Sequence, residues 1–263
     1  MMAQITTMFN ETHKGLLLAW NYKVDLILEV FIMGFAFIGL SFLIGGGSRL
    51  DETQLTASLI GYLVWYFAVK AIADMSTSLQ NEMQAGTLEQ MYMSPTDAGF
   101  LILGRSLSTL LTTTIIAALI AVGPMLLLKI RLPLAPATLP VFIITILGLF
   151  GFGFAVGGFT LIYKQVTALS DLVQYFLVFL NGALLPVELF PPWLAFIARL
   201  LPTTQGIIVL RQVGLEGMSL AETWQDGTLV WLIIHSAVFF ILGWFIFKWC
   251  ETIARKRGLL GQY

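Results

Sequence analysis

Charge is the scarcest property of this sequence: only 11% of its 263 residues are charged, against about 25% in a typical globular domain. Apolar residues make up 58%, and the mean hydropathy is +0.87. A surface with so few charged residues is not stable in water over its whole area. Most of the exterior must therefore contact lipid. The net charge of −1, with no long basic or acidic run, gives no indication of nucleic-acid binding.

The residue patterns that usually carry enzyme chemistry are missing too. The one cysteine, Cys250, excludes an internal disulfide and a cysteine metal cluster, and we expect an ordinary apolar helix residue there. His13 and His235 are far apart with no HExxH motif, and there is no P-loop for nucleotide phosphates. We therefore predict that the chain is not an enzyme by itself and binds no metal or cofactor.

Six apolar stretches are long enough to cross a bilayer core about 30 Å thick, which takes roughly 20 helical residues. They cover residues 24–44, 55–73, 100–128, 139–162, 166–185 and 228–250. In the fourth stretch Gly153 and Gly157 give a face of small residues for close helix packing. No secretory signal is predicted, since no basic residue precedes His13 and Lys14, so we expect the first hydrophobic helix to be retained.

Residues 1–23 place apolar and polar side chains on opposite helical faces, which predicts an amphipathic helix lying along the membrane surface. The predicted fold class is therefore an all-α membrane protein with six transmembrane helices, this interfacial helix and a single domain over residues 1–263.

The distribution of Lys and Arg predicts that both termini are cytoplasmic, because positive residues are retained on the inner side. With the N-terminus inside, nine of the fourteen lie on the inner side: Lys14, Lys23, Lys70, Arg105, Lys164, Lys248, Arg255, Lys256 and Arg257. The outer side then holds Arg49, Lys129, Arg131, Arg199 and Arg211.

The connection at residues 81–97, between the second and third spans, is predicted to be a short amphipathic helix. Its apolar positions recur at helical spacing, with the polar positions mostly on other faces. The apolar positions are Ala85, Leu88, Met91 and Tyr92, and the polar ones Glu82, Gln84, Glu89 and Gln90. Ser94 is expected to cap the following helix, with Pro95 at its first position.

The connection at residues 182–217 is apolar but broken by prolines, at Pro186, Pro191, Pro192 and Pro202. Such a segment can enter a membrane but not cross it, and irregular backbone is tolerated there only where protein or a water-filled cavity satisfies it. We predict a re-entrant hairpin on the outer side, with an apolar loop at the interface as the alternative. This hairpin is a candidate outer gate, and the residues expected to form the gate are Pro186, Glu188, Phe190, Trp193 and Phe196.

Polar residues within the spans are costly in lipid and usually face protein or a cavity. Asp171, Gln174, Asn181 and His235 are candidates for lining a translocation path, with helix-to-helix hydrogen bonds as the alternative. Lys70 and Asp74, four residues apart near the inner end of the second span, are spaced for an ion pair.

The loop from Glu82 to Pro95 resembles the signature of type-2 ATP-binding-cassette (ABC) exporter permeases. In that family a cytoplasmic glutamate, then Gly-Thr-Leu-Glu, then Ser-Pro marks the coupling helix that docks on a separate ATPase subunit. The matching positions are Glu82, Gly86, Thr87, Leu88, Glu89, Met91, Ser94 and Pro95. The resemblance extends over essentially the whole chain, including the amphipathic N-terminal helix, the Pro-rich outer hairpin and the short basic C-terminus.

This resemblance implies a permease of the plasma (inner) membrane that pairs with a second permease copy or paralogue. It also implies an ABC ATPase subunit that binds ATP and Mg. The substrate would be hydrophobic or amphipathic, such as a drug or lipid, moved out of the cytoplasm. A lipid-linked glycan or glycolipid is the alternative, although the Lys-Val-Tyr-Phe-Pro-like stretch of those exporters is absent. A self-sufficient channel or secondary transporter is the alternative from another class, but no inverted repeat is evident.

Overall fold

The computed structural model describes residues 2–44, 51–94, 98–133, 135–163, 166–183 and 187–259, and every regular element in these ranges is a helix. Pro95 and Pro186 lie outside the described residues. The longer elements are α1 (Met2–Asn21), α2 (Lys23–Ile44), α3 (Glu52–Gln84), α5 (Ala98–Leu128), α6 (Thr138–Tyr163), α7 (Thr167–Leu180) and α11 (Thr228–Lys256). The shorter ones are α4 (Leu88–Met93), the 3₁₀ turn η1 (Val187–Leu189), α8 (Pro192–Arg199), α9 (Pro202–Gly214) and α10 (Leu220–Gln225).

Five of these helices, α2, α3, α5, α6 and α11, are long and apolar enough to cross a membrane. The bent pair α8–α9 makes a sixth if it is counted as one span, and the two helices meet at 88°. This confirms the all-α membrane class. The bend falls where a proline-broken hairpin was predicted.

The fifth predicted span, residues 166–185, differs in length from the helix in the structure. Helix α7 has 14 residues, or about 21 Å of rise, and it ends at Leu180. The end has a local cause, because Gly182 adopts a φ of 73°, a left-handed conformation that stops a helix. The Asn181 side chain then accepts a hydrogen bond from the Ala183 N–H at 2.8 Å.

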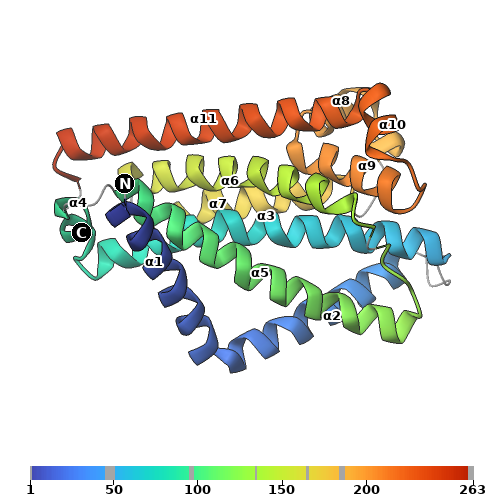
Figure 1. Cartoon of the computed structure of the whole chain (residues 1–263), viewed down its shortest axis with the longest axis horizontal. Helices are drawn as coiled ribbons and strands as arrows, with labels where there is room; N and C mark the ends of the chain where they lie inside the picture. The colour runs from blue at the N-terminus through green and yellow to red at the C-terminus, as the bar shows by residue number, and fades with distance from the viewer. Residues whose placement is uncertain are drawn as a thin grey trace.

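Helix α6 lies in the middle of the bundle between α3 and α11 (Figure 1). Glycines let both neighbours approach closely: a Cβ on Gly243 of α11 would be 1.9 Å from the Gly151 carbonyl oxygen. On the α3 side, a Cβ on Gly153 would be 2.6 Å from the Ala71 carbonyl oxygen, and Gly157 faces Met75 and Leu79. The small-residue face predicted from Gly153 and Gly157 is confirmed as the contact with α3.

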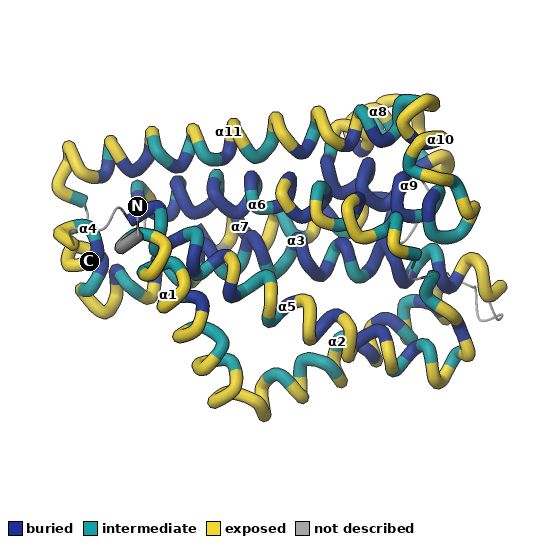
Figure 2. The backbone as a smooth tube through the Cα atoms, viewed as in Figure 1, coloured by how far each residue is buried: buried dark blue, intermediate teal, exposed yellow. Residues whose placement is uncertain are grey.

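The surface of the bundle is apolar where the helices would meet lipid. Figure 2 shows α3 and α6 largely buried and much of α2 exposed. The exposed positions on α2 include Phe31, Ile32 and Phe35. An apolar exterior around a packed helical core is the arrangement that a bilayer requires.

The two ends of the bundle carry different elements. Helix α4 lies at one end, with the start of α1 and the last turn of α11, whereas α8, α9 and α10 lie at the other (Figure 1). The Arg255 guanidinium, in the last turn of α11, lies 4.8 Å from the centre of the Tyr92 ring in α4. The segment resembling a coupling helix is therefore on the side opposite the proline-broken hairpin.

Candidate coupling site

The segment predicted as one helix over residues 81–97 is divided in the structure. Helix α3 continues to Gln84, the chain turns at Gly86 with a φ of 68°, and α4 begins at Leu88. The Gly86 N–H donates to the Met83 carbonyl at 3.0 Å and the Thr87 N–H to the Glu82 carbonyl at 3.0 Å. These two bonds form a Schellman C-cap, whose left-handed position favours glycine. The Gly-Thr of the signature therefore ends α3 and sets the direction of α4.

The apolar face of α4 is covered by the chain itself. Leu88 is 1% exposed and Met91 9% exposed, and both belong to a buried cluster with Met83, Ile102 and Phe247. The apolar face of α4 thus packs within the chain. The outward side of α4 instead exposes Glu89, Gln90 and Met93, the last of them 77% exposed.

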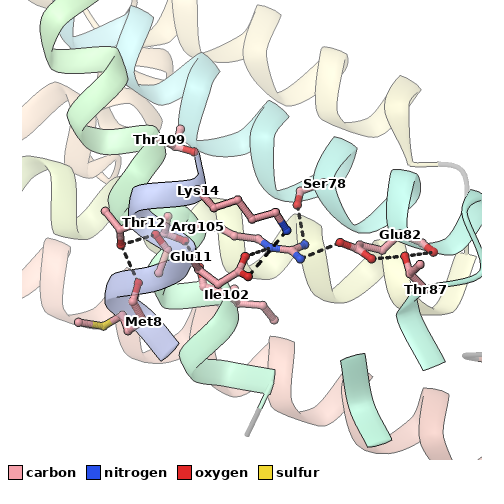
Figure 3. A network of polar contacts seen from close by, with 12 residues as sticks. Met8, Glu11, Thr12, Lys14, Ser78, Glu82, Thr87, Ile102, Arg105 and Thr109 are labelled. Atoms are coloured by element: carbon pink, nitrogen blue, oxygen red, sulfur yellow. Dashed lines mark hydrogen bonds and ion pairs between the residues drawn. The ribbon is translucent and has the colours of Figure 1, made fainter. Parts of the chain in front are cut away.

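Arg105 of α5 connects three helices at this end of the bundle (Figure 3). Its Nη2 donates to Glu82 Oε1 of α3 at 2.7 Å, and its Nε to Glu11 Oε2 of α1 at 3.2 Å. Its Nη1 donates to Ser78 Oγ at 3.1 Å. The planar guanidinium has five N–H donors in a fixed fork, so one side chain can hold two carboxylates and a hydroxyl at once.

The network continues from α3 to the start of α4. The Thr87 hydroxyl donates to the second oxygen of the Glu82 carboxylate, and it also lies 3.3 Å from the Glu82 carbonyl oxygen. The chain of contacts thus runs from Thr87 through Glu82 and Arg105 to Glu11 (Figure 3). The side chains of Arg105, Glu11 and Glu82 are each about one-fifth exposed, so solvent screens these pairs less than it screens a surface ion pair.

Helix α1 is held directly against α5 by short backbone contacts. The Thr12 hydroxyl donates to the Gly104 carbonyl at 3.0 Å, and a Cβ on Gly104 would be 2.7 Å from the Met8 carbonyl oxygen. Farther along α1, Gly15 lies against the Ser108 side chain of α5. Helices α1 and α5 therefore pack as one unit beside the Arg105 network.

At the opposite end, some of the predicted gate and path residues come together. Glu188, Phe196 and His235 line a cavity of about 450 Å³, together with Arg199 and Trp231. The His235 imidazole lies 2.8 Å from the Trp231 carbonyl oxygen through Nδ1. Of the remaining gate residues, Trp193 is exposed on α8 and Phe190 is half-buried before it. Helix α8 itself starts at the Pro191–Pro192 pair.

The other three predicted path residues lie on α7 or at its end. Asp171 is exposed on α7, and Gln174 is half-buried, with its carbonyl 3.4 Å from Trp65 Nε1. Asn181 is fully buried in the turn that ends α7. Of the four predicted path residues, therefore, His235 lines this cavity and the other three do not. A transport role for the α7 residues stays a prediction.

Two arginines matter more in the structure than their sequence positions indicated. From the sequence, Arg105 and Arg211 were distinguished only as charges on the inner and outer sides. Arg211 of α9 donates to the Ala57 carbonyl of α3 at 2.8 Å and to the Gly182 carbonyl at 3.0 Å, which anchors α9 to α3. The available signal was an arginine within an otherwise apolar stretch, which needs a partner.

Among the described residues no cluster of His, Cys, Asp or Glu could hold a metal ion.

Comparison with known proteins gives one family. A family model described as ABC-2 family transporter protein matches residues 51–245, about three-quarters of the chain. The matched range runs from the start of α3 into α11, so it includes Glu82, α4, Arg105 and the bent pair. No curated protein matches the chain.

Proposed function

This chain belongs to the ABC-2 family of transporter proteins, and from that premise we propose that it is the permease subunit of an ATP-driven exporter of hydrophobic or amphipathic molecules. As a member of this family it is an integral membrane subunit of an ABC transporter, a class that works with an ABC ATPase subunit. In our proposal ATP and Mg bind to that ATPase, two permeases form the membrane unit of a plasma (inner) membrane transporter, and both termini are cytoplasmic.

The observation that carries the proposal is the Arg105 network beside α4. The exposed side of α4, with Glu89, Gln90 and Met93, offers a mixed polar and apolar surface for the ATPase. Behind it, the contacts from Thr87 through Glu82 to Arg105 lead into α5 and α1. A push on α4 during closure of the ATPase would therefore move membrane helices rather than a loose loop.

Transport by the reconstituted complex tests this function. The chain and its ATPase would be placed in vesicles with the ATPase face outward, and uptake of a fluorescent amphipathic dye followed after ATP addition. We expect uptake that requires both hydrolysable ATP and the ATPase subunit. Dye movement by the permease alone, at the rate of the complex, would indicate a self-sufficient channel or carrier instead.

We also propose that the α8 segment acts as an outer gate. Trp193 and Phe196 are each 65% exposed, so they contribute little to the packing of this subunit and are available to close a path between two permeases. Apolar contacts of this kind separate without leaving buried polar groups unsatisfied.

A double Trp193→Ala and Phe196→Ala variant is accordingly expected to leave ATP binding unchanged. It should raise passive dye leakage several-fold, or uncouple hydrolysis from export, in the same vesicles. Trp224→Ala, at another exposed aromatic residue of the same end, is the matched control and should not leak. Wild-type leakage and coupling in the double variant would remove the gate role.

A further inference from the structure

A polar cavity of about 560 Å³ lies between α1, α2, α3 and α5, next to the Arg105 network. This volume is within the range of sites that bind small molecules. Its charged lining consists of Glu11, Lys14, Lys70, Asp74, Glu82 and Arg105. Threonine and serine hydroxyls, including those of Thr77, Ser108 and Thr112, supply further hydrogen-bonding groups.

The cavity reaches from the α4 end of the bundle toward the middle of the membrane. Lys70 and Glu82 lie on the same helix, separated by about 18 Å of rise. Ionisable side chains at that depth are costly in lipid and mark functional sites. Leu18 of α1 and Leu26 of α2 line the apolar side of the cavity, where exposed Trp20 and Tyr22 mark the bend between these helices.

The two deepest charges do not satisfy each other. The Lys70 ammonium pairs with Glu29 of α2 and lies 5.7 Å from the centre of the Tyr66 ring. Asp74 accepts a hydrogen bond from Thr109 at 2.5 Å. The expected Lys70–Asp74 ion pair is thus replaced, among the described residues, by contacts with α2 and α5, and Asp74 keeps a carboxylate oxygen for another donor.

Of the three cations in the lining, Arg105 is held by two carboxylates and Lys70 by Glu29, so Lys14 is the cation with the most capacity for a ligand. Lys14 is 60% exposed, and its Nζ lies 3.8 Å from Glu11, whose other oxygen accepts from Arg105. Lys14 and Asp74 are therefore one cation and one carboxylate of the lining that keep capacity for a ligand. A head group that carries both charges matches this pair, whereas a head group with one charge is matched by only one of the two.

We infer that this cavity binds the zwitterionic head group of a phospholipid from the leaflet on the α4 side. Lys14 contacts the phosphate, Asp74 accepts from the ammonium, and the acyl chains leave between α1 and α2 past Leu18 and Leu26. This deepens the proposed function and rests on it, because it identifies the amphipathic substrate class as phospholipid.

Lipid binding to the purified full chain, measured by native mass spectrometry, tests the inference without the ATPase. Dioleoylphosphatidylethanolamine is the zwitterionic probe, and dioleoylphosphatidylglycerol is an anionic probe with the same chains. We expect the first to bind at least fivefold more tightly. Asp74→Asn should weaken its binding about tenfold, because a charged hydrogen-bond partner is lost, while Asp25→Asn, on the exposed surface of α2 outside the cavity, should not.

A second variant tests the site in case Asp74→Asn loses binding only because it fails to fold. Thr77 is exposed and lines the cavity, so Thr77→Trp fills the space without displacing the core and should also block binding of the zwitterionic lipid. Equal binding of both lipids, a preference for the anionic one, or wild-type binding by Thr77→Trp would overturn the inference. Selective binding together with a failure of ATP-driven transport would contradict the proposed function and leave the lipid site standing.

Discussion

Replacing Arg105 with glutamine is expected to abolish ATP-driven transport while the ATPase subunit remains bound and active. The substitution removes the only side chain that contacts Glu11, Glu82 and Ser78 together among the described residues. Glu82 is then left without its cation and Glu11 keeps only Lys14, at 3.8 Å, which should cost about 2–4 kcal/mol of stability. The surface of α4 stays intact, so docking survives, but its movement no longer reaches α1.

Arg105→Lys separates charge from geometry. A single ammonium keeps the charge but lacks the planar fork that spans three partners, so we expect partial stability and at most a tenth of wild-type transport. Arg131→Gln, at an exposed arginine between α5 and α6, is the matched control and should transport normally. Coupled transport at the wild-type rate by Arg105→Gln would show that the network does not transmit the movement.

Substitutions on the exposed side of α4 are expected to affect ATPase binding, whereas those on its buried side are expected to affect stability. Met93→Asp and Glu89→Lys change the exposed side, so they should prevent the ATPase from binding with little change in the melting temperature of the permease. Leu88→Ala removes a side chain that is only 1% exposed, which should cost about 2–5 kcal/mol of stability. In that variant, any loss of ATPase binding should follow the loss of folded protein.

Co-purification of the ATPase and thermal unfolding of the permease in detergent distinguish these effects. Trp224→Ala, at the opposite end of the molecule, should leave both measurements unchanged. If Met93→Asp and Glu89→Lys retain the ATPase in wild-type amounts, the exposed side of α4 is not the docking surface.

Sequence periodicity was sufficient for five of the six predicted spans because their length and apolar composition are local properties. The close approach at Gly153 was predictable for the same reason, since the spacing of small residues defines a helix face. The bend within residues 182–217 was predictable from its prolines, which lack the N–H that a continuous helix uses.

The candidate coupling site was less predictable because it depends on contacts between residues far apart in the sequence. Helical spacing shows that Leu88 and Met91 share a face, but it does not show that the chain's own α3, α5 and α11 cover that face. The Arg105 network joins residues about 20 to 90 positions apart in sequence, which no local pattern relates. The early end of α7 depends on the left-handed Gly182, and one glycine in an apolar stretch does not reveal its φ.

Site-specific photocrosslinking tests most directly the claim that α4 receives an ATPase subunit. A benzoylphenylalanine would be placed at exposed Gln90 of α4 or at Trp224 of α10, at the other end of the bundle, and the complex irradiated in native membranes. The account predicts an adduct with the ATPase from position 90 and none from position 224. An adduct from position 224, or none from position 90 in an active complex, would contradict it.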